Sequence, residues 1–562
     1  MKRLLYGGTV VNVFTGELER ANVLTEDEKI IGVGAYSPCD ADVTEDITGK
    51  YVCPGLIDGH IHVESTMLTP YELARICMPH GTTAIVTDPH EMANVCGVDG
   101  IRYMMEASEG IPLSVYLMLP SCVPATPFDE SGAVLEAENI KPLYAHPRVI
   151  GLAEMMNYPG VLFDVPAVHA KISDAIGLGK AVDGHAPFLS GKDLDKYVAA
   201  GITSDHECSD ANEAIEKIRK GQWIMIRQGT AARNLVDLLP LFDPAYSHRC
   251  VLVTDDRHPA DLLREGHIDN IIRLAVQNGK SVITAIQMAT IQAAQCFGLR
   301  FVGAVAPGYR ADLLVLNDLA SFDVEDVYAR GKRVVEHKRM QPFARPEIDE
   351  RLCEIARNSF HTKEFTPSDF YVEEKSEKCR VIEVIPGQLL TKEKVCAIDW
   401  SQNNGIDIAR DILKLAVIER HRNTGHIGLG FIYGIGLKSG AIASSVSHDS
   451  HNIIVIGTND GDMTVAANHI REHGGNVVVS DGKIVADMAL PIGGLMTDCS
   501  GEKIAEDNER VRQAVYGLGV PRCIEPFMNM AFVSLSVIPS LKMTTQGLVD
   551  VDRQERVPLY CS

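Results

Sequence analysis

The spacing of hydrophobic residues predicts a small β-domain near the start of the chain. Apolar and polar positions alternate in short segments such as 9–13 and 29–33, and glycine-containing turns separate these segments. Alternation with a period of two is typical of half-buried strands. The same pattern returns at 308–316. We therefore predict that residues 1–50 and 300–341 together form one small β-sandwich domain.

Continuous apolar runs replace this alternation between residues 51 and about 260. Amphipathic segments such as 70–78 and 210–220 lie between the runs. Buried parallel strands read as continuous apolar runs, and the connections between parallel strands are usually helices. The eight runs are 51–57, 82–87, 113–119, 149–153, 180–182, 201–203, 223–226 and 250–253. Eight strand–helix units predict a (β/α)8 barrel, which we assign to residues 51–299.

The remainder of the chain predicts a third domain. Residues 342–375 are polar and rich in Glu, Lys and Pro, which is typical of a linker. Strand and helix patterns then alternate over 376–562, which predicts a C-terminal α/β domain. Its candidate strands are 380–384, 427–431, 441–446, 452–457, 476–480 and 483–488. The pair Asp481-Gly482 predicts a tight hairpin turn between the last two strands.

Histidines and carboxylates follow the predicted barrel strands at their carboxyl ends. A barrel gathers these ends on one face, where active sites lie. His60 and His62 are separated by one residue, so both point to the same side of a strand. Histidines placed at random on the surface would not recur at the carboxyl ends of successive strands. Six of the residues at the strand ends have the chemistry of metal ligands: His60, His62, Glu154, His185, His206 and Asp255.

This set of side chains predicts a hydrolytic metal centre. Four imidazoles and two carboxylates suit a pair of divalent ions bridged by a carboxylate and a hydroxide. Such a pair lowers the pKa of bound water to about 7, so hydroxide is available at neutral pH. The last carboxylate, Asp255, can accept a proton from that water and pass it to the leaving group.

The composition of the chain argues against some classes of binding partner and indicates the cellular compartment. The apolar fraction of 46% and the charged fraction of 23% are those of an ordinary globular protein. A formal net charge of −22, from 75 acidic and 53 basic residues, argues against a nucleic-acid or anionic-membrane partner. The chain has no apolar run of membrane-spanning length and no secretory pattern at its start. Its 14 scattered cysteines favour free thiols in a reducing cytoplasm.

The motifs at the strand ends resemble those of a known family. Pro-Gly-Leu-Ile-Asp-Gly-His-Ile-His at 54–62 resembles the first-strand signature of the amidohydrolase superfamily. Members of this superfamily commonly have a metal-dependent (β/α)8 barrel flanked by a small β-domain. Within it, the chain is similar to the bacterial adenine deaminase family over nearly its whole length. The segments that carry this resemblance are 59–67, 87–91, 151–156, 183–187, 254–259, 493–496 and 538–541.

The resemblance implies the hydrolysis of free adenine to hypoxanthine and ammonia. The usual metals would be two Mn²⁺ or Fe²⁺ ions, with Zn²⁺ as a further possibility. By the same resemblance, His60 and His62 hold the more buried ion, and His185 and His206 hold the other. Glu154 bridges the two ions. Asp255 completes the first site and transfers the proton. The catalytic residues are therefore Asp255, Glu154 and His206.

The family pattern also implies residues that contact the substrate. A bridging hydroxide attacks C6 of adenine, and negative charge then moves to N1, which needs a proton donor. His90, Glu91 and Glu207 are all candidates for this donor. Asp256 follows the expected ligand Asp255 and is expected, together with Arg227, to contact the substrate.

Two other readings are compatible with the fold. Hydantoinase-like and dihydroorotase-like amidohydrolases use a carbamylated lysine after strand four, where this chain has Glu154, so a cyclic amidase is the disfavoured alternative. A non-catalytic scaffold of the same fold is the other reading, and such proteins lose metal ligands that are all present in this chain. We expect a homo-oligomer of two or more chains.

The segment Ser-His-Asp-Ser-His-Asn at 447–452 in the third region has two interpretations. It is either a polar loop that begins a strand or a loop that covers the mouth of the barrel, in the same subunit or a neighbouring one. Its two histidines, His448 and His451, make the second interpretation worth testing.

Overall fold

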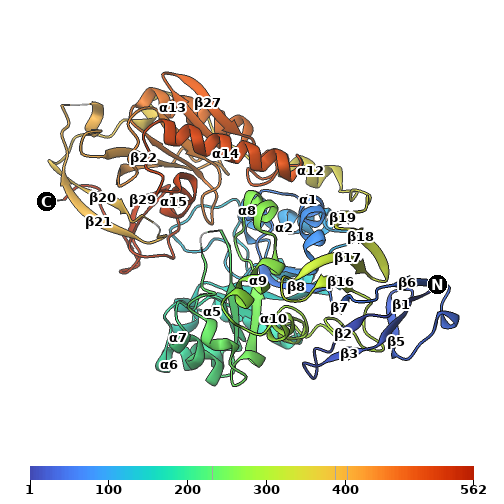
Figure 1. Cartoon of the computed structure of the whole chain (residues 1–562). Helices are drawn as coiled ribbons and strands as arrows, with labels where there is room; N and C mark the ends of the chain where they lie inside the picture. Colours follow the sequence, from blue (N-terminus) through green and yellow to red (C-terminus); the bar gives the residue numbers. More distant parts are fainter. Residues whose placement is uncertain (231, 387, 402, 562) are drawn as a thin grey trace.

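The computed structural model describes residues 1–230, 232–386, 388–401 and 403–561. Figure 1 shows the small β-domain with the N-terminus at one end of the molecule and the C-terminal region, in orange and red, at the other. The barrel lies between them. Among the described residues, no helix combines the length and the apolar character needed to cross a membrane.

The small β-domain contains segments from both sides of the barrel, as predicted. Its first sheet has the order β5 (Lys29–Gly34), β4 (Asn22–Glu26), β1 (Lys2–Tyr6) and β6 (Val43–Asp46). Its second sheet has the order β19 (Arg339–Met340), β18 (Lys332–Glu336), β17 (Asp323–Ala329), β16 (Leu313–Asp318), β7 (Tyr51–Pro54), β2 (Thr9–Val11) and β3 (Leu18–Arg20). Antiparallel pairing of β16 with β7 joins the two parts of the sequence.

The apolar run predicted at 51–57 divides between two sheets. Its first half is β7 in the small β-domain, and its second half begins barrel strand β8 (Leu56–Ile61). The chain crosses at Gly55, whose amide donates to the carbonyl of Asp312, while the amide of Leu56 donates to Gly81. A Cβ at Gly55 would lie 2.1 Å from Oγ1 of Thr83, so only glycine fits this crossing.

Eight parallel strands form the barrel, which confirms the predicted fold class. They are β8, β9 (Thr82–Thr87), β10 (Ser114–Leu119), β11 (Val149–Met155), β12 (Ala181–Gly184), β13 (Ser204–Asp205), β14 (Trp223–Arg227) and β15 (Cys250–Val253). Two ladders, β12-β11-β10-β9-β8 and β13-β14-β15, make up most of the ring. A bridge between Ile61 and Asp255 closes the ring on one side, and a hydrogen bond from the Thr203 amide to the Val182 carbonyl closes it on the other.

Helices follow the barrel strands. The main ones are α1 (Pro70–Cys77), α2 (His90–Ala107), α5 (Pro166–Gly177), α6 (Gly191–Ala199), α7 (Ala211–Arg219), α8 (Pro259–Glu265) and α9 (Ile268–Gln277). The helical pattern predicted over 282–296 is two helices, α10 (Val282–Met288) and α11 (Ile291–Cys296). The interruption has a clear cause, because the carbonyl of Ala289 accepts a hydrogen bond from Ile57 in β8.

The C-terminal region is built on one eight-stranded sheet. Its order is β21 (Thr391–Ala397), β20 (Lys378–Val384), β23 (Ile427–Tyr433), β22 (Ile412–Ile418), β25 (Ile453–Gly457), β24 (Ala441–Ser444), β26 (Asn476–Ser480) and β27 (Lys483–Met488). A second sheet has the order β28 (Leu541–Thr544), β29 (Gly547–Asp550) and β30 (Glu555–Arg556). The helices are α13 (Asp460–His473), α14 (Gly501–Gly517) and α15 (Pro526–Val533). The predicted hairpin is confirmed, with positive φ at Asp481 and Gly482.

Two helices connect the C-terminal region to the barrel. Helix α14 packs against α8, and α12 (Glu350–Arg357), within the predicted linker, packs against α2. The C-terminal region thereby lies beside α1, α2 and α8 of the barrel (Figure 1). The predicted division at residues 299, 341 and 375 remains a proposal about independent folding units.

Candidate metal centre at the mouth of the barrel

Three of the predicted ligands meet where β8 and β15 lie side by side. Nε2 of His60 lies 3.2 Å from Nε2 of His62, and Oδ1 of Asp255 lies 3.4 Å from the latter and 3.7 Å from the former. Ligands at about 2.0–2.2 Å from one tetrahedral ion are about 3.3–3.6 Å apart. The three atoms therefore have the spacing of ligands to a common ion.

The backbone places Asp255 at this point. Its amide donates to the carbonyl of His60 across 2.9 Å, and its φ of 58° turns the chain sharply at the end of β15. Asp58, two residues before His60 in β8, accepts hydrogen bonds from the amide and the hydroxyl of Thr254. These contacts fix β8 and β15 in register, and so they set the distance between the ligands.

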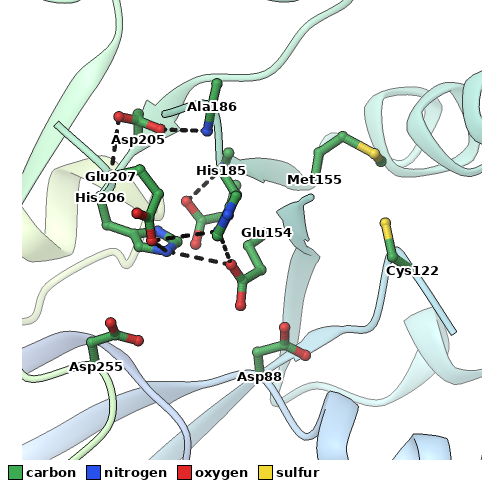
Figure 2. A network of polar contacts seen from close by, with 12 residues as sticks. Asp88, Cys122, Glu154, Met155, His185, Ala186, Asp205, His206, Glu207 and Asp255 are labelled. Atoms are coloured by element: carbon green, nitrogen blue, oxygen red, sulfur yellow. Dashed lines mark hydrogen bonds and ion pairs between the residues drawn. The ribbon is translucent and has the colours of Figure 1, made fainter. Parts of the chain in front are cut away.

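Glu154 lies between this group and the other two histidines. Its Oε1 is 3.3 Å from Nε2 of His62, and its Oε2 is 2.7 Å from Nδ1 of His185 and 3.3 Å from Nε2 of His206. Figure 2 shows His185 and His206 on one side of Glu154, with Asp255 below them in the view. A carboxylate whose two oxygens face different sets of imidazoles has the geometry of a bridging ligand.

Further contacts orient the first two imidazoles. Nδ1 of His60 is 3.0 Å from Oδ2 of Asp183, and Nδ1 of His62 is 3.2 Å from the carbonyl of Asp88. Acceptors at Nδ1 hold the proton there and leave the lone pair of Nε2 directed at the centre. The structure thus brings together all six predicted ligands with the correct ring nitrogens of His60 and His62 facing inward.

The electrostatics of the cluster also suit cations. Burial would raise the pKa of Glu154, but contacts with His185, His206 and His62 hold it well below its ordinary value. Burial would lower the pKa of His62, but contacts with Asp255 and Glu154 hold it well above its usual value. The buried carboxylates are stabilised in their ionised form by nearby positive charge. A set of N and O donors with this charge would also suit divalent ions.

Arg227 lies beside the cluster and contacts two carboxylates, Asp255 and Glu207. It forms two hydrogen bonds with Glu207, of 2.5 and 2.8 Å, and a third of 2.9 Å with Oδ2 of Asp255. Glu207 Oε1 lies 3.3 Å from Nε2 of His206, so it is close to the second pair of histidines. Arg227 and Glu207 were predicted to contact the substrate, and the structure places both at the edge of the metal centre.

Comparisons with known proteins agree with this geometry. The Amidohydrolase family model matches residues 51–334, and the model named Adenine deaminase C-terminal domain matches residues 388–555. An adenine deaminase from Desulfatibacillum aliphaticivorans is 45% identical over 99% of this chain and 97% of that protein. Adenine deaminase 2 from Carboxydothermus hydrogenoformans is 46% identical over 99% of this chain and 96% of that protein.

The chain belongs to the adenine deaminase family of amidohydrolases. Amidohydrolases of this family depend on metal, in agreement with the buried His and Asp clusters. Among solved structures, a dihydropyrimidinase from Brevibacillus agri NCHU1002 aligns with a TM-score of 0.46 at 18% identity, over 60% of this chain and 96% of that one.

The other residues predicted to contact the substrate in this adenine deaminase family member divide into two groups. Nδ1 of His90 is 2.9 Å from Oδ2 of Asp88 and 3.8 Å from Oε1 of Glu154, which places His90 beside the bridging carboxylate. Glu91 and Asp256 instead lie within 2.8 and 2.6 Å of the hydroxyl of Ser65. Asp255 and not Asp256 faces the imidazoles, as the family pattern implies.

A cavity of about 690 Å³ opens over the metal centre. The cluster residues form its floor, and the C-terminal region forms much of its wall. The residues of the C-terminal region that line it include Leu389, His448, Asp449, Phe532, Leu535 and Ile538. His448 and Asp449 of the 447–452 loop line this cavity within the same chain, in agreement with the interpretation that the loop lines or covers the mouth of the barrel. Sequence reasoning missed Asp449 and the apolar wall, although the cluster of polar residues around His448 indicated the loop.

Proposed function

We propose that this chain hydrolyses adenine to hypoxanthine and ammonia at a centre of two divalent ions, with Mn²⁺ or Fe²⁺ as the metals. One observation carries the proposal. The six ligands predicted from the strand ends lie close together at the mouth of the barrel, and five of them are buried. The cavity above them is walled by the C-terminal region that is characteristic of adenine deaminases.

His60, His62 and Asp255 would hold one ion, and His185 and His206 the other, with Glu154 shared between them. With ions bound there, the site would supply a water with a pKa near 7 for attack on C6 of adenine. Asp255 accepts the proton of the attacking water and returns it to the departing ammonia. Arg227 holds the second oxygen of Asp255, so that the first remains directed at the reacting centre.

We assign His90 as the residue that donates a proton to N1. Asp88 accepts from its Nδ1, which leaves Nε2 as the atom available to the cavity. The other two candidates are held elsewhere, because Arg227 binds both oxygens of Glu207 and Ser65 hydrogen-bonds Glu91. Nδ1 of His90 also lies 3.8 Å from Oε1 of Glu154, and N1 is bonded to the carbon under attack.

The cyclic amidase alternative is not favoured. Glu154 is a carboxylate in its own right, so no lysine has to be carbamylated to bridge the ions. The scaffold alternative is not favoured either, because the set of ligands is complete and five of the six are buried.

We also propose that the enzyme is a cytoplasmic homo-oligomer. All 14 cysteines are free, as expected in a reducing compartment. Phe163 and Phe188 line the cavity rim and are 82% and 73% exposed, which a second copy of the chain would cover. Light scattering of the wild type and of a Phe163→Ser/Phe188→Ser variant tests this, and a monomeric wild type would contradict it.

The function is tested by ammonia release from adenine, guanine, adenosine, cytosine and dihydrouracil, with protein reconstituted with Mn(II) or Fe(II). We expect metal-dependent turnover of adenine in preference to the other four compounds. Metal-dependent ring opening of dihydrouracil without turnover of adenine would instead support the cyclic amidase. If adenine is not consumed with either metal, the proposal is wrong.

A further inference from the structure

Asp205 joins the two loops that carry the predicted ligands His185 and His206. Its Oδ1 accepts a hydrogen bond from the amide of Ala186 across 2.8 Å, and its Oδ2 accepts one from the amide of Glu207 across 3.2 Å. Ala186 and Glu207 directly follow the two histidines in the chain. Figure 2 shows this carboxylate above the two histidines, with a dashed line to Ala186. One buried side chain therefore holds the ends of β12 and β13 together.

This junction differs from most strand pairs of the barrel. β12 ends one ladder and β13 begins the other, so among the described residues no ladder joins the two strands. Acceptors at Nδ1 orient His60 and His62, whereas Nδ1 of His206 has no hydrogen-bond partner in the described part of the chain. The direction of the His206 ring therefore depends on how its loop is held.

Lys217 of α7 holds the carboxylate of Asp205 in this position. Its ammonium donates to Oδ2 of Asp205 across 3.0 Å, to the carbonyl of Ala186 across 2.7 Å and to Oε1 of Glu213 across 2.7 Å. The side chains of Lys217 and Asp205 are both 0% exposed. Burial would lower the pKa of Lys217, but contacts led by the one with Asp205 hold it above its ordinary value, so the amine is charged. Removing one partner of such a buried ion pair leaves an uncompensated charge.

Glu213 extends the contacts of α7 to the far ends of the same two loops. Its Oε1 accepts from the amide of Phe188 across 2.8 Å, and its Oε2 accepts from the amide of Ser209 across 3.1 Å. Phe188 and Ser209 each lie three residues beyond a predicted ligand. Lys217 and Glu213, one helical turn apart, thus attach both loops to the same helix.

We propose that Lys217, acting through Asp205, positions His185 and His206 as the ligands of the second ion. This inference rests on the proposed function, which assigns the second ion to these two histidines. Lys217 is not among the described residues that line the cavity, so it is a positioning residue and not a catalytic one. Without its ammonium, Asp205 would lose its counter-charge and turn toward water. The two loops would then lose the acceptor that they share, and with it the spacing that a common ion requires of the two imidazoles.

The first ion should not depend on Lys217. The amide of Asp255 donates to the carbonyl of His60, and Asp58 accepts from the amide of Thr254. These contacts join β8 to β15 and do not involve α7. Loss of Lys217 should therefore weaken one of the two ions selectively, which a general loss of stability would not do.

Titration of the metal-free protein with Mn(II), with free Mn(II) followed by electron paramagnetic resonance, measures the two ions separately. In a His60→Asn background, which lacks a ligand of the first ion, Lys217→Met should weaken binding of the remaining ion by about 10- to 100-fold. In a His185→Asn background the remaining ion is the first, and Lys217→Met should leave its affinity within about threefold. Lys220→Met, on the same helix but bonded to Asp195 of α6, is the matched control and should change neither affinity. Equal losses in the two backgrounds, no loss in either, or loss of the first ion alone would overturn the proposal.

Asp205→Asn tests the same contact with a change that keeps the shape of the side chain. In the same two backgrounds it should weaken the second ion and spare the first, which keeps the proposal testable if Lys217→Met does not fold. Because Lys217 acts through Asp205, the double variant should bind the second ion no more weakly than the weaker of the two single variants. Losses that add in the double variant would overturn the proposed route through Asp205.

These outcomes do not require turnover, so they separate this inference from the proposed reaction. A wild type that binds only one Mn(II) would overturn the role of Lys217, whether or not adenine is deaminated. A wild type that binds two ions, loses affinity for the second in Lys217→Met and does not deaminate adenine would support that role and refute the proposed function.

Discussion

Arg227 donates a hydrogen bond to Oδ2 of Asp255 across 2.9 Å, at the point where the last barrel strand reaches the metal centre. The same carboxylate directs Oδ1 toward Nε2 of His62, 3.4 Å away. One oxygen of Asp255 thus accepts from a guanidinium, and the other faces the imidazoles of the candidate metal centre. The orientation of the predicted proton acceptor therefore depends on a side chain that is not itself a predicted ligand.

Replacement of this guanidinium should impair the centre without abolishing it. In Arg227→Met, Asp255 and Glu207 lose their shared donor, and we expect a loss of about 10- to 100-fold in metal affinity or in kcat/KM. Arg219→Met, at an exposed position at the end of α7, is the control. Metal titration and steady-state kinetics of both variants provide the measurement. Unchanged metal affinity and unchanged kcat/KM in Arg227→Met would show that Asp255 needs no such support.

Glu154→Gln should damage both halves of the centre at once. The neutral amide keeps the shape of the side chain but presents one oxygen instead of two to His62 and His185. We expect kcat to fall by about 10³-fold or more and at least one metal equivalent to be lost. Metal analysis after dialysis, with exposed Glu138→Gln as the control, checks this. Full metal content in Glu154→Gln would contradict a bridging role.

His90→Gln tests the assignment of the proton donor. A positioned general acid contributes about 10²- to 10⁴-fold, so kcat should fall by this range while KM changes little. Metal content should remain at the wild-type level, because His90 is not among the six predicted ligands. His337→Gln, at a 72% exposed side chain, is the control. If kcat is retained, the proton reaches N1 from another group, and Glu91 becomes the next candidate.

Lys542 should make the stability of the C-terminal region depend on pH. Burial lowers the pKa of this lysine to about 7, and its ammonium contacts the carbonyls of Leu389 and Phe532. Between pH 7 and about 10 the unfolded chain binds a proton that the folded chain lacks, so the free energy of unfolding should rise with pH in this window. The total effect is at most about 5 kcal/mol.

Denaturant unfolding at pH 7, 8.5 and 10 measures this effect. Lys542→Met removes the titrating group, so its free energy of unfolding should rise less between pH 7 and 10 than that of the wild type. Lys503→Met replaces a half-exposed lysine on α14 and should keep the wild-type slope. Equal slopes in Lys542→Met and the wild type would mean that the buried amine does not titrate in this range.

The barrel and its ligands could be predicted because their signals are local. Continuous apolar runs mark the buried strands, and side chains at their carboxyl ends must share one face, so His60 and Asp255 were expected to meet although 194 residues separate them in the sequence. The division of the run at 51–57 could not be predicted. Both halves are equally apolar, and only the pairing of β7 with β16 shows where the barrel begins.

The sequence by itself determined which residues are the candidate metal ligands, since their chemistry and position at strand ends follow from the barrel. Only the tertiary structure decided what surrounds the substrate. The pairing of Arg227 with Asp255 depends on side-chain direction, and the wall that includes Asp449 comes from a loop about 200 residues beyond the last barrel strand. No periodicity links that loop to the barrel, because its position results from the packing of α14 on α8 and of α12 on α2.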